Sequence, residues 1–351
     1  MNLTKVAVLY NEPASDSVKN NPYDPHHDLD FTPVMDVHDS SPAEDYKDIV
    51  ARLRSLGFDA YSLNTLDSFP RLIQNLRTEK PDVIFNFIEL FHDEVTNEKN
   101  IAGIYELLKI PYTGAPPMAL ANCQSKILTK KLLRAHNIKV PDFIIIKELA
   151  PAYDHNLNYP LIIKPAYEDG SGGIENDSVV KDYDSFFKRV NFILTDFKQP
   201  VVAEEFIAGR EFNVSVLGEK EPVVLPISEI DFSEMPPYLE KIVSFQAKWD
   251  PMHEAYHKTQ PICPAVIPPD IKHKIEEIAL SCYNIMGVRD YARVDIRLSE
   301  NNEIFVLEVN PNPDLTEGLG FMRSADYAGF SYNDILAKIV NFALDRKKEG
   351  K

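Results

Sequence analysis

The chain has 351 residues, 44% of them hydrophobic and 26% charged, with a formal net charge of −17. This composition is typical of a folded globular protein with room for two or three packed units, and no apolar run approaches the roughly 20 residues of a membrane helix. The acidic balance argues against a nucleic-acid surface, which would gather Lys and Arg. We therefore expect neither nucleic acid nor a membrane as a partner.

The first residues and the cysteines indicate the compartment. The stretch MNLTKVAVLYNEP reaches an apolar strand almost at once and has no small-residue cleavage site, so we expect no signal peptide. Cys123, Cys263 and Cys282 are odd in number and widely spaced, which is typical of reduced thiols rather than of disulfides or a metal site. Both observations predict a cytoplasmic protein.

The first 118 residues alternate between strands and helices. Apolar strands are predicted at 5–10 and 81–88. Between them a helix begins after the capping residue Ser41 and ends at Gly57, and a second helical face follows at 101–108. Strand–helix–strand alternation predicts a parallel α/β domain.

Residues 14–40 interrupt this pattern. They have no period and are rich in Pro, Asp, Asn and His, which indicates a loop. Some of its side chains could be drawn as a metal site, although polar loops collect such residues for solvation as well: His26, His27, Asp28, Asp30, Asp36, His38 and Asp39. The loop could instead be a lid or a disordered excursion.

The rest of the chain predicts two α+β units, 119–207 and 208–351. Helical and strand patterns alternate in both, and no internal repeat is evident. The predicted helices are at 125–138, 185–196, 270–286 and from Ser331, and the predicted strands are at 142–146, 159–165, 200–218, 291–298 and 303–310.

The last two strands predict a hairpin with an acidic face. Period two puts Arg293 and Asp295 on one face, and a tight turn brings the next strand back antiparallel. In the register that we expect, Arg293 faces Glu308 and Asp295 faces Val306. Asp295, Glu308 and Asn310 then converge on one side of the ribbon.

Two explanations fit this convergence. Neighbouring carboxylates repel each other and are costly to bury, and a divalent cation removes that cost, with Asn310 as a neutral third oxygen ligand. Alternatively, Arg293 pairs with Glu308 across the strands, as on many protein surfaces. The hairpin alone leaves both explanations open.

A glycine-rich loop follows a strand that ends in a lysine. Lys164 closes the run YPLIIK, and the chain then passes through Gly170, Ser171, Gly172 and Gly173. Only 13 glycines occur in the whole chain, so three within four positions indicate a special backbone. Such a loop suits phosphates because its N–H groups are free to donate, although most glycine-rich loops are simple turns.

A second acidic segment and two lysines are weaker signals. The segment VVAEEFIAGREF has three carboxylates around Phe206 and Ile207, those of Glu204, Glu205 and Glu211. They suit an amine and ribose hydroxyls, although an acidic sheet edge is the simpler explanation in isolation. Lys126 and Lys248, taken singly, are typical of solvated surface residues.

Taken in order, these segments resemble the ATP-grasp superfamily, and within it the D-alanine–D-alanine ligase branch. The resemblance is carried by IPYTGA, SK at Lys126, IIKP at Lys164, GSGG, AEEFIAGREF, AKW, ARVDIRL and LEVNPNP, which span most of the chain. It implies an N-terminal α/β (pre-ATP-grasp) domain followed by two α+β subdomains of an ATP-grasp fold, which hold ATP between them.

The resemblance also implies roles for single residues. Glu204 would take the adenine amine, Ile207 the ring through its backbone, and Glu211 the ribose. The nucleotide would be bound by Lys126, Lys164, Gly170, Gly172, Gly173, Glu204, Glu205, Phe206, Ile207, Glu211 and Lys248. Two Mg²⁺ ions, with Mn²⁺ as a substitute, would be held by Asp295, Glu308 and Asn310. The catalytic residues would be Arg293, Lys248 and Ser171.

The implied reaction is ATP-dependent joining of a small carboxylate to an amine through an acyl phosphate, in a homodimer. Substrate-binding segments depart from the family: its Gly-Gly after the first strand reads NEP here, its His-Gly reads NFIE, and its Ser-Pro-Gly-type turn reads PNPD. We therefore expect amino acids or related small acids other than D-alanine as substrates. The alternatives are a D-alanine–D-alanine ligase proper, an ATP-grasp kinase and a nucleotide-binding regulator.

The segment TEGLGF predicts a turn before a helix. The N–H groups near Gly318 and Gly320 suit a substrate carboxylate. A plain helix start explains the segment equally well.

Overall fold

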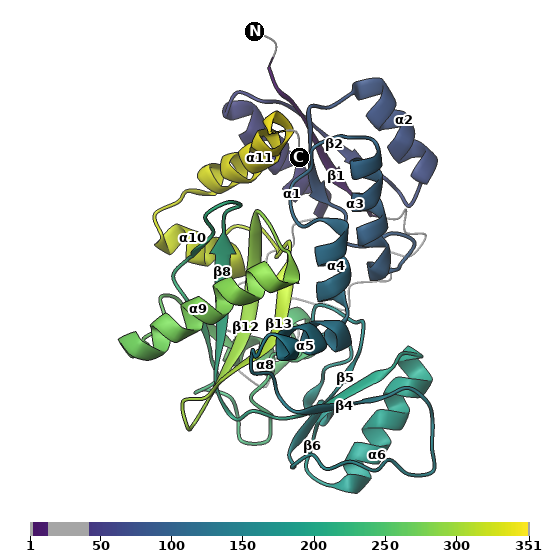
Figure 1. Cartoon of the computed structure of the whole chain (residues 1–351), viewed down its shortest axis with the longest axis vertical. Coiled ribbons are helices and arrows are strands. Elements are labelled where there is room, and N and C mark those ends of the chain that lie inside the picture. The colour runs from purple at the N-terminus through teal and green to yellow at the C-terminus, as the bar shows by residue number, and fades with distance from the viewer. Residues whose placement is uncertain (1–2, 13–41, 350–351) are drawn as a thin grey trace.

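The structure is a computed structural model that describes residues 3–12 and 42–349. Three β-sheets with packed helices follow one another along the long axis of the molecule (Figure 1). The predicted fold, an α/β domain followed by two α+β units, is confirmed. Within the described residues, none of the helices has the length and apolar character needed to span a membrane.

The N-terminal sheet is parallel, with the strand order β2-β1-β3. Its first strand is buried from Val6 to Tyr10 because helices cover both faces of the sheet. The strands are β1 (Lys5–Tyr10), β2 (Asp59–Asn64) and β3 (Val83–Phe87). The helices that follow them along the chain are α1 (Pro42–Ser55), α2 (Phe69–Glu79) and α3 (Glu98–Leu107).

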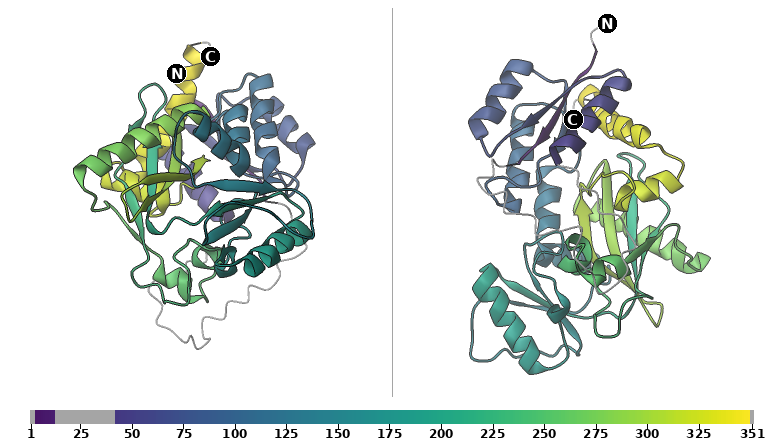
Figure 2. Two further views of the ribbon diagram at one scale, coloured as in Figure 1. Left: turned by 60° about the horizontal axis from the view of Figure 1, so that its bottom comes forward. Right: turned by 180° about the vertical axis from the view of Figure 1, so that it is seen from behind.

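The last helix of the chain returns to this first sheet. α11 (Tyr332–Lys348) buries Ile335, Ile339 and Val340 against Val6 and Val8 of β1, on the face that α1 also covers. Figures 1 and 2 show this helix, in yellow, beside the purple N-terminal strands. The two ends of the described chain therefore share one core.

The central sheet is antiparallel, with the order β4-β7-β5-β6. Helix α6 (Tyr183–Phe192), capped by Asp182, packs on it through Phe186 and Val190. The strands are β4 (Phe143–Ile146), β5 (Leu161–Pro165), β6 (Val179–Val180) and β7 (Val201–Glu205).

The C-terminal sheet has six strands in the order β11-β10-β8-β12-β13, with β9 paired to β8. Helix α9 (Pro269–Met286), which ends at Gly287 with a φ of 72°, packs on it through Ile275 and Ala279. The strands are β8 (Gly209–Leu217), β9 (Val223–Val224), β10 (Ser228–Asp231), β11 (Gln260–Ile262), β12 (Tyr291–Ser299) and β13 (Ile304–Pro311).

Shorter helices connect the sheets. They are α4 (Pro117–Gln124), α5 (Lys126–Ala135), α7 (Phe245–Trp249), α8 (Glu254–Lys258) and α10 (Gly320–Tyr327). The division of the chain after residues 118 and 207 remains a proposal. The first point lies inside α4 and the second lies in the turn between β7 and β8, where the single strand predicted at 200–218 is broken.

Two sequence predictions fall outside the described residues. These are the cap at Ser41 and the loop at 14–40 with its candidate metal ligands. The other predicted elements in the first domain are confirmed, and Gly57 follows α1 with a φ of 88°. Cys123, Cys263 and Cys282 are free thiols, as predicted.

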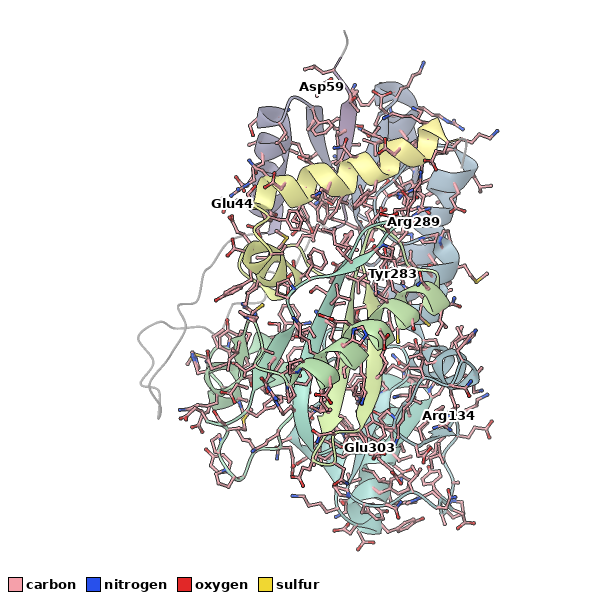
Figure 3. The ribbon with its side chains drawn as sticks, turned by 60° about the vertical axis from the view of Figure 1, so that its left-hand side comes forward. Glu44, Asp59, Arg134, Tyr283, Arg289 and Glu303 are labelled. Carbon is pink, nitrogen blue, oxygen red and sulfur yellow. The ribbon has the colours of Figure 1, made fainter. Side chains whose placement is uncertain are left out.

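A buried ion pair joins the first domain to the last. Asp290, at the start of β12, is fully buried and pairs with Arg346 of α11. The Arg346 Nη2 also donates to the Tyr112 carbonyl at 2.7 Å, and the Gly114 N–H donates to Asp290 Oδ2 at 2.8 Å. Arg289 Nε reaches the Gly114 carbonyl at 2.8 Å, at the junction visible beneath α11 in Figure 3. Arg289 and Asp290, which lead into β12, therefore bind the segment IPYTGA.

The Arg346→Met substitution tests this junction. It leaves Asp290 buried without its cation, so we expect the free energy of unfolding to fall by about 3–5 kcal/mol in urea denaturation. Lys348→Met is the control, because Lys348 lies exposed on the same helix and its loss should cost less than about 1 kcal/mol. Equal effects of the two substitutions would contradict the assignment.

Candidate active site

The hairpin of β12 and β13 has a different register from the one expected. Asp295 lies opposite Glu308 and Arg293 lies opposite Asn310, so the expected pairs, Asp295 with Val306 and Arg293 with Glu308, are wrong. The register shifts after Asp295, where a β-bulge leaves Leu307 as an extra residue on β13. Strict alternation cannot reveal such an insertion. The bulge places the two carboxylates directly across from each other.

The convergence of three oxygen-bearing side chains is nevertheless present. The Asn310 Nδ2 donates to Asp295 Oδ2 at 2.9 Å and to Glu308 Oε1 at 3.2 Å. Asp295 is only 6% exposed. A half-turn of the Asn310 amide brings its oxygen to the position that its nitrogen now occupies, which would complete a cluster of oxygen ligands.

Arg293 belongs to the same cluster but pairs within its own strand. Its Nε donates to Asp295 Oδ1 at 2.7 Å and its Nη2 to Oδ2 at 2.9 Å, a bidentate contact. Asn213 of β8 donates to Asp295 Oδ1 at 2.8 Å. The alternative explanation, in which Arg293 pairs with Glu308 across the strands, is therefore not what the structure has.

The remaining charge of the cluster is compensated from the central subdomain. Burial favours the neutral form of Glu308, but Lys126, Lys164 and Arg293 outweigh it and hold the pKa of Glu308 below its usual range. Within residues 3–12 and 42–349, no three His, Cys, Asp or Glu side chains are grouped closely enough to hold a metal ion by themselves. Two carboxylates and an amide nevertheless suit Mg²⁺, which commonly binds one or two carboxylates together with substrate phosphates.

Lys164 ends β5 and forms a buried ion pair with Glu204 of β7. Its Nζ lies 2.6 Å from Glu204 Oε1, and Lys130 pairs with the other carboxylate oxygen. Burial disfavours the charge on Lys164, but Glu204 more than offsets it and raises the pKa of Lys164. Burial also lowers the pKa of Lys130. The carboxylate predicted to take the adenine amine is thus engaged by two lysines here.

The sequence reasoning missed Lys130. It lies four residues after Lys126 on α5, and that i, i+4 spacing was the available signal. Lys126 itself follows the capping residue Ser125, and its backbone N–H donates to the Ala166 carbonyl at 3.1 Å. This contact brings the start of α5 beside the end of β5 and therefore places Lys126 near Lys164.

A cavity brings several of these groups together. Among the residues that line it are Lys126 from α5, Asp169 from the glycine-rich loop, and Glu308 and Asn310 from β13. Glu98, which the sequence reasoning also missed, lines the same cavity. The phosphate-binding lysine and the metal ligands that were predicted separately thus border one space.

The glycine-rich loop has the backbone that its composition predicts. Gly170, Ser171 and Gly173 all have φ values between 57° and 66°, in the left-handed region. A Cβ on Gly173 would also lie 2.7 Å from the ring of Pro165, so this position requires glycine. The loop therefore owes its shape to the residues that were selected from the sequence.

Three hydrogen bonds connect this loop to the segment that carries Lys248. Ser171 Oγ donates to the Val243 carbonyl at 2.8 Å, and Trp249 Nε1 donates to the Gly170 carbonyl at 2.7 Å. The Phe245 N–H donates to the Ile174 carbonyl at 2.7 Å. A Cβ on Gly170 would lie 3.9 Å from Lys248 Nζ, so Lys248 lies beside the loop. The glycine-rich loop and residues 243–249 therefore form one connected unit, the cover.

The residues after β7 are engaged in different ways. Glu205 Oε1 accepts from the backbone and side chain of Asn158, both at 2.8 Å. Glu211 pairs with Arg297 at 2.7 Å, and Arg297 also donates to the Ile207 carbonyl at 3.5 Å. Phe206 packs in an apolar cluster with Ile162, Ile174, Val179 and Ile242. Arg297 is a further residue that the sequence reasoning missed.

The TEGLGF turn lies beside the reacting end of the site. Gly320 begins α10, and a Cβ on it would lie 4.0 Å from Arg293 Nη1. Gly318 precedes it with a φ of 79°. The start of a helix therefore faces the arginine that was predicted to be catalytic.

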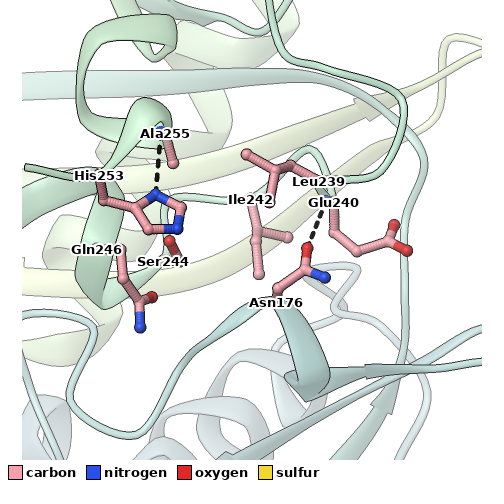
Figure 4. A pocket seen from close by; sticks show the side chains of 8 residues that line it. All are labelled: Asn176, Leu239, Glu240, Ile242, Ser244, Gln246, His253 and Ala255. Carbon is pink, nitrogen blue, oxygen red and sulfur yellow. Dashed lines mark hydrogen bonds between the residues drawn. The ribbon is translucent and has the colours of Figure 1, made fainter. Parts of the chain in front are cut away.

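A second pocket lies beside the segment that leads to Lys248. It is lined by Asn176, Leu239, Glu240, Ile242, Ser244, Gln246, His253 and Ala255 (Figure 4). His253 Nδ1 accepts from the Ala255 N–H at 3.1 Å, and Asn176 Oδ1 accepts from the Glu240 N–H at 2.7 Å. None of the residues predicted for the active site lines this pocket.

Comparison with known proteins decides the family. The family model described as "D-ala D-ala ligase C-terminus" matches residues 132–341, which is more than half of the chain. The chain belongs to the D-alanine–D-alanine ligase family. The D-alanine–D-alanine ligase of Carboxydothermus hydrogenoformans is 31% identical over 313 residues, which cover 85% of this chain and 93% of that relative.

Other similar proteins are comparably distant. The uncharacterized protein y4sG of Sinorhizobium fredii is 29% identical over 305 residues, which cover 85% of this chain and 87% of that protein. The crystal structure of the D-alanine–D-alanine ligase of Bacillus anthracis in complex with ATP matches with a TM-score of 0.73, at 23% identity and over 100% of both chains. This structural match confirms the ATP-grasp fold.

Membership in the D-alanine–D-alanine ligase family fixes the reaction class. The chain is an ATP-dependent ligase that forms C–N bonds, and its cofactors are ATP and Mg²⁺. The predicted class, cofactors and ligase-like branch are confirmed. The roles of the single site residues stay predictions.

Glu98 makes the stability of the folded chain depend on pH. Burial raises the pKa of this carboxyl to about 8, from an ordinary value of 4.5. Between these two pH values the folded chain therefore holds one more proton at Glu98 than the unfolded chain, and its stability falls as the pH rises through this range. In urea denaturation between pH 5 and 9, Glu98→Gln should remove this part of the decline. Parallel pH profiles for the two proteins would contradict the assignment.

The bond between Trp249 and the loop should contribute to nucleotide binding. Trp249→Phe keeps an aromatic ring but removes the donor to Gly170, and one hydrogen bond corresponds to roughly a twofold to tenfold weaker affinity. Calorimetric titration with a non-hydrolysable ATP analogue measures this change. Tyr153→Phe is the matched control, because it removes a hydrogen bond to Asn191 within the central subdomain. Unchanged affinity in Trp249→Phe would show that the cover does not depend on this bond.

Proposed function

We propose that the chain joins an amino acid or a related small carboxylate to an amine, through an acyl phosphate, with release of ADP and phosphate. One observation carries the proposal: Asp295, Glu308 and Asn310 converge beside Arg293 and face the lysines of the central subdomain. Such a site neutralises the charge of a phosphoryl group during transfer.

The nucleotide would lie between the central and C-terminal subdomains. Lys126 and Lys164 would contact its phosphates, and the glycine-rich loop with Lys248 would cover them. When bound, Mg²⁺ would neutralise part of the phosphate charge, with Asp295, Glu308 and Asn310 as its protein ligands. We keep the predicted adenine and ribose contacts at Glu204, Ile207 and Glu211 as part of the proposal, together with Phe206 and Glu205.

The chemistry requires two separate stabilisations. A substrate carboxylate attacks the terminal phosphoryl group, and the amine then attacks the resulting acyl carbonyl. Arg293, held in place by Asp295, is positioned to donate to the oxyanion that develops at that carbonyl. The hydrogen bond from Ser171 to Val243 connects the glycine-rich loop to residues 243–249. In this position the loop would exclude water, which otherwise hydrolyses the intermediate. The N–H groups near Gly318 and Gly320 would orient a substrate carboxylate.

The acceptor region supports a substrate other than D-alanine. Where family members have Gly-Gly after the first strand, Asn11 here ties three loops together. Its Oδ1 accepts from the Asp67 N–H at 2.9 Å and its Nδ2 donates to the Leu90 carbonyl at 3.1 Å. Glu12 and Glu89 follow β1 and β3. Burial raises the pKa of Tyr46, and the charges of Glu89 and Glu12 raise it further. Activity as a D-alanine–D-alanine ligase proper remains the second candidate, favoured by the names of the relatives.

Assembly and location complete the proposal. A homodimer formed through the first domain and a cytoplasmic location are what the family resemblance suggests. Light scattering on the purified chain tests the first, and a fluorescent fusion in cells tests the second.

Hydroxylamine trapping tests the proposed reaction. The chain is incubated with ATP, Mg²⁺ and a library of small acids, and the acid that is activated yields a hydroxamate. We expect one class of amino acid to give a hydroxamate and to stimulate ADP release with an amine. Stimulation by D-alanine, with the dipeptide detected by mass spectrometry, would select the second candidate. The absence of any hydroxamate and any stimulated ADP release would contradict ligation.

Substitution of a metal ligand gives a residue-level test. Glu308→Gln should lower kcat by at least about a hundredfold, because it removes a ligand charge that acts on the transferring phosphoryl group. Glu303→Gln is the control, since Glu303 lies at the turn of the same hairpin (Figure 3). There it is exposed and pairs with Lys139. Similar kcat values for the two variants would contradict the proposed role.

A further inference from the structure

The turn that follows the metal-binding strand has an unusual backbone. β13 ends at Pro311, and the chain continues through Asn312 and Pro313. Asn312 has a φ of 51°, in the left-handed region. Asn tolerates this conformation better than most residues, but a following proline restricts the residue before it to extended backbone. A strained conformation of this kind persists only where its surroundings hold it.

The Asn312 side chain is held on both sides by the first domain. Its Oδ1 accepts from the Ala115 N–H at 2.8 Å, and its Nδ2 donates to Glu98 Oε1 at 3.0 Å. Glu98 is 7% exposed, and its other oxygen accepts from Gln124 Nε2 at 2.8 Å. One amide thus connects the end of β13 to two elements of the first domain, the IPYTGA segment and α3.

The contact is so close that only glycine fits beside it. A Cβ on Gly114 would lie 2.2 Å from Asn312 Oδ1. Gly114 has a φ of 88° and also donates its N–H to Asp290 at the start of β12. Gly114 and Ala115 therefore bind the hairpin at its open end, β12 through Asp290 and β13 through Asn312.

These contacts lie next to the predicted metal ligands. Asn310, on β13, is two residues before Asn312, and Glu308 is two residues before Asn310. β13 is the edge strand of its sheet, so it pairs with a strand on one side only, and the bulge at Leu307 interrupts that pairing just before Glu308. The bonds of Asn312 hold the end of the strand from outside the sheet.

We propose that Asn312 is a positioning residue for the metal–nucleotide site, acting through its bonds to Glu98 and Ala115. It sets the end of β13 so that Glu308 and Asn310 face Lys126 across the cavity. The inference rests on the proposed function, because it concerns the proposed metal ligands. If Asn312 only joined two domains, its loss would lower stability and leave metal affinity unchanged.

Asn312→Gly is the informative substitution. Glycine adopts the left-handed conformation without strain, so the change removes the side-chain bonds and leaves the turn possible. Mn²⁺ binding to the full chain, with a non-hydrolysable ATP analogue present, is measured by electron paramagnetic resonance. We expect the Mn²⁺ Kd to rise about tenfold, which corresponds to about 1.4 kcal/mol.

Tyr153→Phe controls for stability. It removes the hydrogen bond from the hydroxyl of the buried Tyr153 to Asn191 Oδ1 at 2.9 Å, within the core of the central subdomain. We expect it to lower the melting temperature while the Mn²⁺ Kd stays within about twofold of wild type. This comparison separates loss of stability from loss of positioning.

A double-mutant cycle identifies the contact that acts. Because Asn312 acts partly through Glu98, Asn312→Gly should raise the Mn²⁺ Kd less in a Glu98→Ala background than in wild type. If Asn312→Gly fails to fold, Glu98→Ala alone, which leaves the turn intact, must still raise the Kd severalfold. A Kd within twofold of wild type in the folded variants would overturn the inference and leave the proposed function standing. Failure of the wild-type chain to bind Mn²⁺ with the analogue would overturn both.

Discussion

The repulsion between two carboxylates organises the active site. Asp295 and Glu308 lie directly across from each other on a hairpin, and Asp295 is buried while Glu308 is half-buried. Burying such a pair is costly unless cations surround it. The chain supplies Arg293 on one side and Lys126 and Lys164 on the other, and an ATP-grasp ligase adds Mg²⁺. The features that make the pair of carboxylates unfavourable by itself are those that suit it to bind a metal–nucleotide.

Binding of a metal–nucleotide between these groups requires that parts of all three domains keep fixed positions. The lysines belong to the central subdomain, the carboxylates to the C-terminal sheet, and the segment that grips the hairpin to the first domain. α11 returns from the C-terminal unit to the first sheet, and Arg346 on it pairs with Asp290 at the start of β12. The first domain therefore contacts the hairpin that carries the proposed metal ligands at the start of β12 and at the end of β13.

Much of this arrangement could be predicted from the sequence, because it depends on local patterns. The strands at 291–298 and 303–310 and the convergence of Asp295, Glu308 and Asn310 follow from periodicity and residue type, and the glycine-rich loop stands out by its composition. The register of the hairpin could not be predicted, since an extra residue in a bulge leaves no mark on an alternating pattern. The partners of Glu204 were missed because Lys130 meets it only when α5 packs beside β7. The bonds of Asn312 join positions about 200 residues apart, which no local pattern encodes.

The most direct measurement is a crystal structure of the chain with Mg²⁺ and a non-hydrolysable ATP analogue. The account predicts metal density within coordination distance of Asp295, Glu308 and Asn310, with the phosphates between that density and Lys126 and Lys164. Metal density elsewhere, or phosphates bound away from the hairpin while Asp295 and Glu308 face only protein, would contradict it.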